Sequence, residues 1–225
     1  MRKLLFPILL CVAGLAVLLS LGFWQLERLD WKEGVLAGIE ARMSGEAIAV
    51  PAEPNEETDE YRSVMLTGDL SGSELHVLTS GTSAGTGYLA IRAITLTDGR
   101  RILLDQGLLP LDQKNAPPTD TTVEVLGNLL WPDDINSSTP EPDLSANIWF
   151  GRDLEAMAEA LNTEPLLVVV RSSAPADPRL TPVPVNTSTI KNDHLEYAVT
   201  WFGLAVVWAL MSLYWVFRIL RPKDA

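Results

Sequence analysis

The feature that most constrains this chain is a pair of long apolar runs, one near each end. Residues 4–24 and residues 197–217 contain no charged side chain, and each run is 21 residues long. About 20 apolar residues in a helix cross the hydrocarbon core of a bilayer, which is about 30 Å thick. Each run therefore predicts a transmembrane helix.

The first run has one competing interpretation, a cleaved signal peptide, because Arg2 and Lys3 stand directly before it. A signal peptide carries an apolar stretch of about 7–15 residues and ends at a cleavage site of small residues. This run is longer, and it ends in the bulky pair Phe23-Trp24. We therefore expect an uncleaved anchor.

The charge of the chain is concentrated between the two runs. The 225 residues carry a net charge of −12, although the mean hydropathy is positive at +0.15. Residues 25–196 hold 28 of the 29 acidic and 12 of the 17 basic side chains, a net charge of −16. A nucleic-acid partner requires a basic surface. The sequence therefore predicts an acidic domain between two membrane spans, with membrane lipid around the spans and no nucleic-acid partner.

Positive side chains also indicate the orientation of the spans. Basic residues occur in the short tails 1–3 and 218–225, outside both apolar runs. The positive-inside rule then places both termini in the cytoplasm and residues 25–196 on the far side. No Arg-rich, acid-poor transit segment precedes the first run, which favours a bacterial inner membrane and a periplasmic central domain.

The pattern between the spans is typical of a β-rich α+β domain. Helical spacing continues from the first span to about Met43, and the acidic residues 51–60 are typical of a solvated linker. Asp98-Gly99 predicts a tight hairpin turn, and Asp153 predicts the N-cap of a helix over 153–161. Gly72 is expected in a turn, and the glycine-rich residues 81–87 in a hairpin loop. Strand-like segments lie at 61–70, 74–79, 87–97, 101–109, 121–130 and 165–171.

The central domain offers little catalytic chemistry. The one cysteine, Cys11, lies in the first apolar run, so thiol chemistry and thiolate metal sites are excluded from the domain. No nucleophile-elbow, zinc-protease or phosphate-loop motif is present. His76 lies beside apolar residues in a strand-like segment, where a structural or surface role is expected. We therefore expect a protein that is not an enzyme.

The second histidine stands at the head of an aromatic series. If the second helix begins near Asn192, then His194, Trp201, Trp208 and Trp215 recur every seven residues. Seven residues are nearly two helical turns, with a drift of about 20° per heptad, so the four side chains form one stripe. One interpretation is a packing seam between the spans beneath an interfacial histidine. The other is an imidazole ligand to a large planar cofactor or lipid-like molecule, since imidazole is a usual axial ligand of haem iron.

Two specific motifs bracket the central domain: residues 22–28 with Trp31 and Lys32, and residues 192–202. Through them the whole chain resembles the SURF1 family of cytochrome c oxidase assembly factors. One departure is residues 105–110, Asp-Gln-Gly-Leu-Leu-Pro, where the family commonly has Asn-Arg-Gly-Trp-hydrophobic-Pro. Between the motifs, residues typical of the family follow in order: Tyr61, Gly68, Gly87, Tyr88, Asp98, Gly99, Leu104, residues 107–110, residues 147–150 and Asp153.

The resemblance implies a helper in assembly of the terminal haem–copper oxidase. Such a protein binds haem a and assists its delivery to, or stabilisation in, the catalytic subunit I, alongside other assembly factors. His194 matches the family's haem-associated histidine and would ligate the iron, with Tyr197 and Trp201 as further haem-binding residues. Two alternatives stay open: a structural chaperone that docks on oxidase subunits through Trp24, Trp31 and the central domain without holding haem, and a membrane-tethered periplasmic enzyme or sensor. The sequence also leaves open whether the chain forms homo-oligomers.

Overall fold

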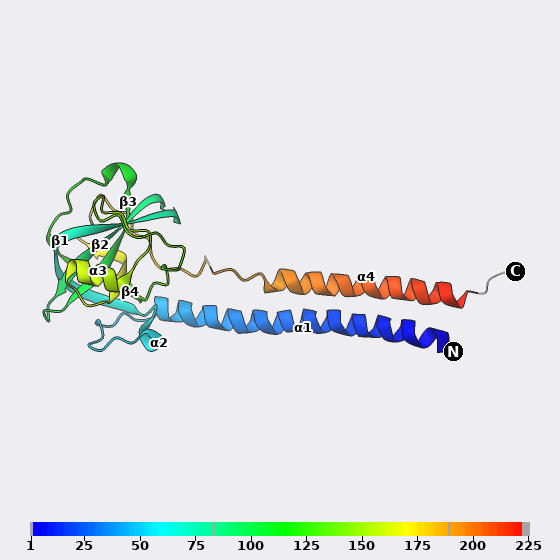
Figure 1. The fold of residues 1–225 in the computed structure, drawn as a ribbon. Helices are drawn as coiled ribbons and strands as arrows, with labels where there is room; N and C mark the ends of the chain where they lie inside the picture. Colours follow the sequence, from blue (N-terminus) through cyan, green and yellow to red (C-terminus); the bar gives the residue numbers. More distant parts are fainter. Residues whose placement is uncertain (1, 83, 189, 222–225) are drawn as a thin grey trace. The chain divides into compact units, whose positions relative to one another are not determined.

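The computed structural model describes residues 2–82, 84–188 and 190–221, and it separates into two compact units (Figure 1). One unit, residues 1–38 and 187–225, contains two long helices. The other, residues 39–186, contains a β-barrel and a short covering helix. The expected succession of apolar helix, β-rich domain and apolar helix is therefore confirmed.

The two long helices are α1, Arg2–Ser44, and α4, His194–Leu220. Both are long and apolar enough to cross a membrane. The expected continuation of the first helix beyond its apolar run is confirmed, since α1 ends at Ser44. Both helices leave most of their large apolar side chains exposed to the surroundings. Side chains of this kind match a hydrocarbon environment, as the sequence predicts for both runs.

Five strands close the barrel in the order β1-β2-β3-β5-β4. All neighbouring strands are antiparallel except β3 and β5, which are parallel. The strands are β1 Ser63–Thr82, β2 Gly85–Leu96, β3 Arg101–Pro110, β4 Thr121–Leu130 and β5 Leu167–Ala174. A 3-10 turn, η1 Leu111–Gln113, follows β3. The Asp98-Gly99 hairpin is confirmed, with Gly99 at φ +90° between β2 and β3.

One predicted turn is wrong. The segments predicted as two strands, 61–70 and 74–79, form the single long strand β1. Gly72, expected in a turn between them, lies inside β1 at φ +82°, where the pairing with β2 shifts between Leu70 and Glu74. Glycine tolerates this positive φ in a bulge that bends a strand without ending it. The sequence signals for a turn and for such a bulge are the same.

The acidic segment 51–60 is also more ordered than a solvated linker. It contains a short helix, α2 Glu56–Asp59, which Asn55 caps by accepting a hydrogen bond from the Glu57 N–H at 2.9 Å. Asp59 is buried, and its carboxylate lies 3.0 Å from the Arg62 guanidinium. An opposite charge three residues along the chain gives this carboxylate a local partner that a charge count does not reveal.

The helix α3, Leu154–Leu161, lies against the barrel wall (Figure 1). Its predicted cap is confirmed, because the Asp153 carboxylate accepts a hydrogen bond from the Ala156 N–H at 3.0 Å. Met157 and Leu161 of α3 pack against Leu103 and Leu167 in one apolar cluster. A second cluster is formed by Val64, Leu66, Leu70, Ile94, Leu96, Ile102, Leu104, Val123, Val125, Leu129, Leu166, Val168 and Val170. The strand β3 contributes to both clusters and is buried on both faces.

Candidate functional site

The two long helices pack antiparallel around Trp208. Its indole Nε1 donates a hydrogen bond to the Cys11 backbone carbonyl of α1 at 2.9 Å. Gly14 lies one turn further along α1, and a Cβ placed there would be 2.5 Å from the Trp208 ring. The ring can lie against α1 because position 14 has no side chain. Trp208 therefore belongs to the packing seam between the helices.

Aromatic packing continues towards the start of α4. The rings of Phe23 and Phe202 meet edge to face, with centroids 5.4 Å apart and an interplanar angle of 78°. Gly22 again allows the close approach, since a Cβ there would lie 2.7 Å from the Phe202 ring. On α4, Ala198 and Ala205 are buried as well. Small residues at a helix interface are typical of close helix pairing in membranes, because they let the two backbones approach.

The seam ends in a polar pair, Gln25 on α1 and His194 on α4. The Gln25 amide Oε1 lies 2.7 Å from the His194 Nδ1. Gln25 is only 8% exposed, and His194 is half-buried at the first position of α4. The Lys32 ammonium also donates a hydrogen bond to the Lys191 carbonyl, just ahead of α4. Two side chains of α1 therefore hold the beginning of α4.

The structure separates the predicted stripe into different environments. His194 and Trp208 contact α1, Trp201 is half-buried, and Trp215 is 42% exposed. Tyr197, three residues after His194, is 55% exposed. Positions 194, 197 and 201 are three and seven residues apart in one helix, so they lie on one side of α4. The packing-seam interpretation applies to Trp208, and the predicted haem-binding residues border the exposed part of the same side.

Sequence reasoning did not identify Gln25 as part of this site. The sequence does contain a feature that could have identified it, because Gln25 is the first polar side chain after the uncharged run of residues 4–24. What the sequence could not supply is the partner, which lies 169 residues away. The antiparallel register of α1 and α4 is needed to bring the two side chains together.

The His194 imidazole has the donor chemistry that would hold a haem iron. His194 engages Nδ1 with Gln25, while Nε2 has no hydrogen-bond partner within residues 2–82, 84–188 and 190–221. In that same part of the chain, no three His, Cys, Asp or Glu side chains are grouped to hold a bare metal ion. An iron held in a porphyrin requires only axial ligands from protein. A single imidazole beside exposed aromatic rings is consistent with that kind of ligand.

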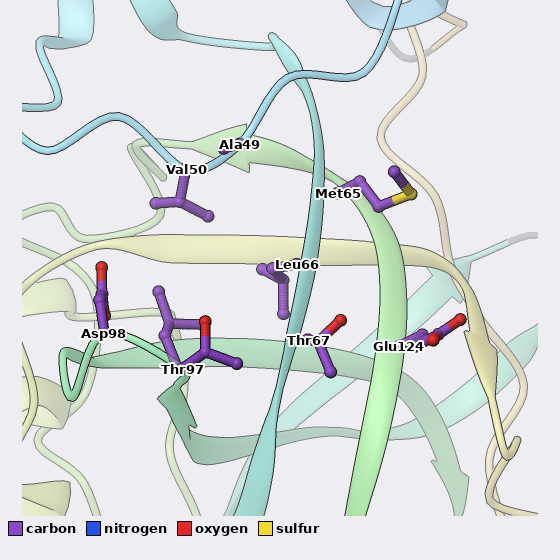
Figure 2. Close-up of a pocket in the computed structure, with 9 residues that line it drawn as sticks. Ala49, Val50, Met65, Leu66, Thr67, Thr97, Asp98 and Glu124 are labelled. Atoms are coloured by element: carbon purple, nitrogen blue, oxygen red, sulfur yellow. The ribbon is translucent and has the colours of Figure 1, made fainter.

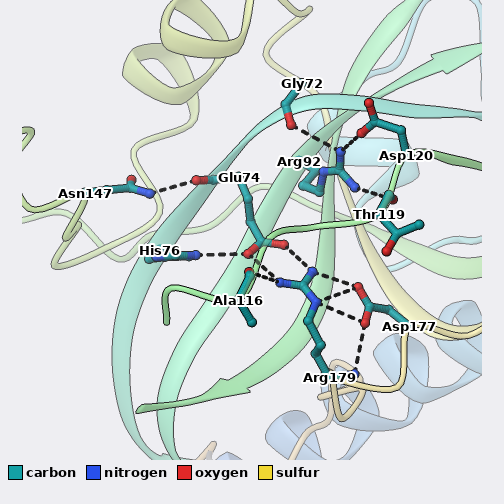
Figure 3. Close-up of polar contacts among 10 residues, drawn as sticks. All are labelled: Gly72, Glu74, His76, Arg92, Ala116, Thr119, Asp120, Asn147, Asp177 and Arg179. Carbon is teal, nitrogen blue, oxygen red and sulfur yellow. Dashed lines mark hydrogen bonds and ion pairs between the residues drawn. The ribbon is translucent and has the colours of Figure 1, made fainter. Parts of the chain in front are cut away.

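A network of buried charges occupies the barrel (Figure 3). The Glu74 carboxylate lies 3.0 Å from the His76 Nε2 and 2.9 Å from the Arg179 guanidinium, which also pairs with Asp177 at 2.7 Å. Burial raises the pKa of Glu74, but hydrogen bonds from His76 and Arg179 outweigh it, so the net pKa is lowered. His76 is therefore a buried structural residue, in agreement with its expected role.

A second buried cation, Arg92, extends the network to the bulge in β1. It is fully buried, and its guanidinium contacts Asp120 at 2.5 Å, the Thr119 carbonyl at 2.9 Å and the Gly72 carbonyl at 3.2 Å (Figure 3). Every one of these partners is a carboxylate or a backbone carbonyl of the barrel unit. The groups neutralise one another and fix loops to strands, which is a structural task.

The barrel unit also has an open groove of about 420 Å³ (Figure 2). Val50, Met65 and Leu66 supply apolar lining, and the carboxylates of Asp98 and Glu124 lie at opposite ends. The Asp98 carboxylate accepts a hydrogen bond from the Arg100 N–H at 2.9 Å and lies apart from Glu124, so the two carboxylates do not act as a pair. The groove therefore gives no basis for assigning an active site.

Residues 105–110, where the sequence departs from the pattern of the family that it resembles, have a clear structural role. Asp105 is buried in β3, its carboxylate accepts a hydrogen bond from the Gly107 N–H at 3.1 Å, and it lies 3.4 Å from Arg152. Burial raises the pKa of Asp105, and Arg152 only partly opposes that effect. Gly107 has φ +113°, and a Cβ there would lie 2.3 Å from the Thr181 carbonyl oxygen.

The fold and site define a class of protein, in which a small β-barrel lies in the sequence between two apolar helices that pair with each other and carry an available imidazole. Comparison with known sequences then gives the family. The SURF1 family model matches residues 12–206, and the chain belongs to the SURF1 family.

Individual relatives agree over most of the chain. It is 30% identical to human Surfeit locus protein 1, covering 90% of this chain and 74% of that protein. Identity is also 30% to a SURF1-like protein of Rickettsia felis, with 90% and 92% covered, and to Surfeit locus protein 1 of Takifugu rubripes, with 92% and 94% covered. The family match includes both Gln25 and His194.

Proposed function

We propose that this protein is a non-enzymatic assembly factor for a haem–copper cytochrome c oxidase, and that it holds haem a for the catalytic subunit I. Membership of the SURF1 family supports the assembly role. The observation that carries the haem role is the His194 imidazole, whose Nδ1 is engaged by Gln25 at 2.7 Å. Its other nitrogen is the ligand atom that haem iron uses.

In this proposal three residues of α4 have different roles in haem binding. His194 Nε2 would hold the iron, while Tyr197 and Trp201, which lie on the same side of the helix, would provide aromatic surface for the macrocycle. Haem a supplies an iron that accepts an imidazole ligand and an apolar tail that membrane lipid accommodates. The protein's part is to orient the imidazole and to keep the cofactor at one place.

The proposed location is the bacterial inner membrane. Both termini lie in the cytoplasm, α1 and α4 cross the bilayer, and the barrel lies in the periplasm, as the basic tails indicate. His194 then stands at the periplasmic edge of α4. A cofactor held there is within reach of subunit I in the same membrane, and of other assembly factors.

One observation favours a second candidate, a structural chaperone that contacts oxidase subunits without holding haem. Trp24 and Trp31 of α1 are 52% and 54% exposed, and the Arg28 guanidinium lies 3.9 Å from the Trp31 ring centroid. Exposed tryptophan and arginine are typical of protein interfaces. This surface offers a partner contact that does not involve His194.

The deciding experiment compares full-length wild type, His194→Ala and Thr200→Ala purified from cells that make haem a. Thr200 is an exposed residue of α4, which makes its variant a matched control. We expect haem to copurify with wild type and Thr200→Ala, and His194→Ala to lose most of it. Equal haem content in all three proteins would contradict a haem role for His194.

The same variants separate the two candidates in a strain that lacks the protein. Under the haem-holding proposal, His194→Ala fails to restore the oxidase haem bands in membrane spectra. Under the chaperone candidate, His194→Ala restores them, whereas replacement of Trp24 and Trp31 together does not. A deletion strain with normal oxidase spectra would refute both.

A further inference from the structure

Gln25 is a buried amide with a specific partner. It is 8% exposed, it lies where the apolar packing of α1 and α4 ends, and its Oε1 is 2.7 Å from His194 Nδ1. A buried polar group without a hydrogen bond destabilises a protein by about 1–3 kcal/mol. A glutamine at this position is therefore stable only when it is paired, and its partner comes from the other helix.

The chemistry of an amide oxygen determines where the imidazole proton lies. An amide oxygen can only accept a hydrogen bond, so the His194 Nδ1 beside it must carry the proton. A neutral imidazole has one N–H, and Nε2 consequently keeps its lone pair. Nε2 has no hydrogen-bond partner in the described part of the chain, residue ranges 2–82, 84–188 and 190–221.

The same contact fixes the direction of the ring. His194 is the first residue of α4, and the side chain of its N-cap residue, Asp193, makes no capping hydrogen bond. A ring at a helix start is free to rotate unless another group holds it. Gln25 holds the ring from α1, and the Lys32 hydrogen bond to the Lys191 carbonyl holds the segment just before it. The two contacts keep the start of α4 against α1.

From these contacts we propose that Gln25 is a positioning residue, which fixes the tautomer and orientation of His194 so that Nε2 faces the haem iron. The inference rests on the proposed function and deepens it. Metal-binding histidines generally donate their second N–H to a carboxylate, carbonyl or water, and loss of that partner weakens metal binding about 10- to 100-fold. Here the partner that accepts the second N–H of the histidine is a glutamine from the opposite helix, so the site requires both α1 and α4.

The first test reads the proton directly in the haem-free protein. Full-length protein with 15N-labelled histidine is placed in lipid nanodiscs at pH about 8, where an ordinary histidine is neutral. The chain has only two histidines, so the His194 signals are assigned by their loss in His194→Ala. We expect the Nδ1–H tautomer in wild type and a shift to Nε2–H, which free histidine prefers, in Gln25→Leu.

The second test measures haem binding by titration with purified haem a. Gln25→Leu removes the acceptor at similar side-chain size, and its dissociation constant is expected to rise about 10- to 100-fold. Gln25→Glu keeps an acceptor and is expected to restore binding. Glu27→Ala, at an exposed position two residues along α1, is the matched control and should bind as wild type does.

The outcomes distinguish this inference from the proposed function. An Nε2–H tautomer in wild type, or unchanged haem affinity in Gln25→Leu, overturns the role of Gln25 while His194 remains the ligand. Failure of wild type to bind haem a at all overturns the proposed function. In that case the imidazole signals still decide whether Gln25 sets the proton on His194. Circular dichroism of Gln25→Leu confirms that its helices are retained.

Discussion

At the residue scale, Asp105 is the clearest case of a carboxylate whose burial disfavours its charged form. It is 2% exposed, and its contact with Arg152 is long, at 3.4 Å, because Arg152 binds Asp134 more closely, at 2.7 Å. Burial raises the pKa of Asp105 above its ordinary value. The folded protein therefore holds this proton more tightly than the unfolded chain does.

This raised pKa gives a prediction about stability and pH. The contribution of Asp105 to stability is fully present below its ordinary pKa of about 3.9 and is lost as pH rises through the folded value. Asp105→Asn keeps an acceptor for the Gly107 N–H without the charge. We expect it to melt at a higher temperature than wild type near neutral pH, with the difference shrinking as pH falls towards 4.

The measurement is the thermal midpoint of the barrel, determined on the full-length chain in detergent at several pH values. Unfolding is monitored by near-ultraviolet circular dichroism. Asp112→Asn serves as control, since Asp112 is exposed in the turn η1. A constant difference between Asp105→Asn and wild type at every pH would show that Asp105 does not titrate as described.

Gly107 gives a second prediction at this scale. Its φ is +113°, a backbone conformation that strains any residue with a side chain. A Cβ at this position would also lie 2.3 Å from the Thr181 carbonyl oxygen. We expect Gly107→Ala to lower the free energy of unfolding by about 3 kcal/mol. Gly99→Ala is a matched control, because φ is +90° there but the surrounding space is open. Its loss should be about 1 kcal/mol. Equal losses would show that backbone strain alone matters.

At the scale of elements, local chemistry explains what the sequence predicted. The Asp98-Gly99 turn and the Asp153 cap each depend on residues within a few positions, and both are confirmed. The ends of β1 and the bulge at Gly72 depend instead on pairing with β2 and β4, which the sequence does not display. Because β3 is buried on both faces, it lacks the alternation that marks a half-buried strand. The Gln25–His194 pair likewise depends on the register of two distant helices.

The packing of α1 on α4 predicts the effect of a single added side chain. A Cβ at Gly14 would lie 2.5 Å from the Trp208 ring, so Gly14→Leu should displace that ring and weaken helix pairing by about 1–3 kcal/mol. Fluorine NMR of protein labelled with fluorotryptophan measures this through the Trp208 signal, assigned with Trp208→Phe. Gly203→Leu, where the surrounding space is open, should leave the signal in place. An unmoved signal in Gly14→Leu would show that the helices do not pack as described.

At the scale of the whole molecule, the charge distribution connects the fold with the proposed location. The apolar helices carry the excess hydropathy, the central segment carries a net charge of −16, and the basic residues outside it lie in the tails. The site at His194 lies at the C-terminal end of the acidic segment, where the second long helix begins. A soluble cofactor carrier would not need this division. Under the proposed function, the division suits a protein that holds an apolar cofactor beside a membrane enzyme.

The proposed orientation makes a last prediction that does not depend on haem. In a Cys11→Ser background, Ser137→Cys places a thiol on an exposed loop of the barrel unit, and Ala225→Cys places one in the basic tail. A membrane-impermeant maleimide added to intact spheroplasts should label position 137 and leave position 225 unlabelled, whereas disrupted membranes should show both. Labelling of position 225 alone would show that the topology is inverted and that His194 lies at the cytoplasmic edge. Labelling of both in intact spheroplasts would mean that α4 does not cross the membrane, because the tail and the barrel would then share the periplasmic side.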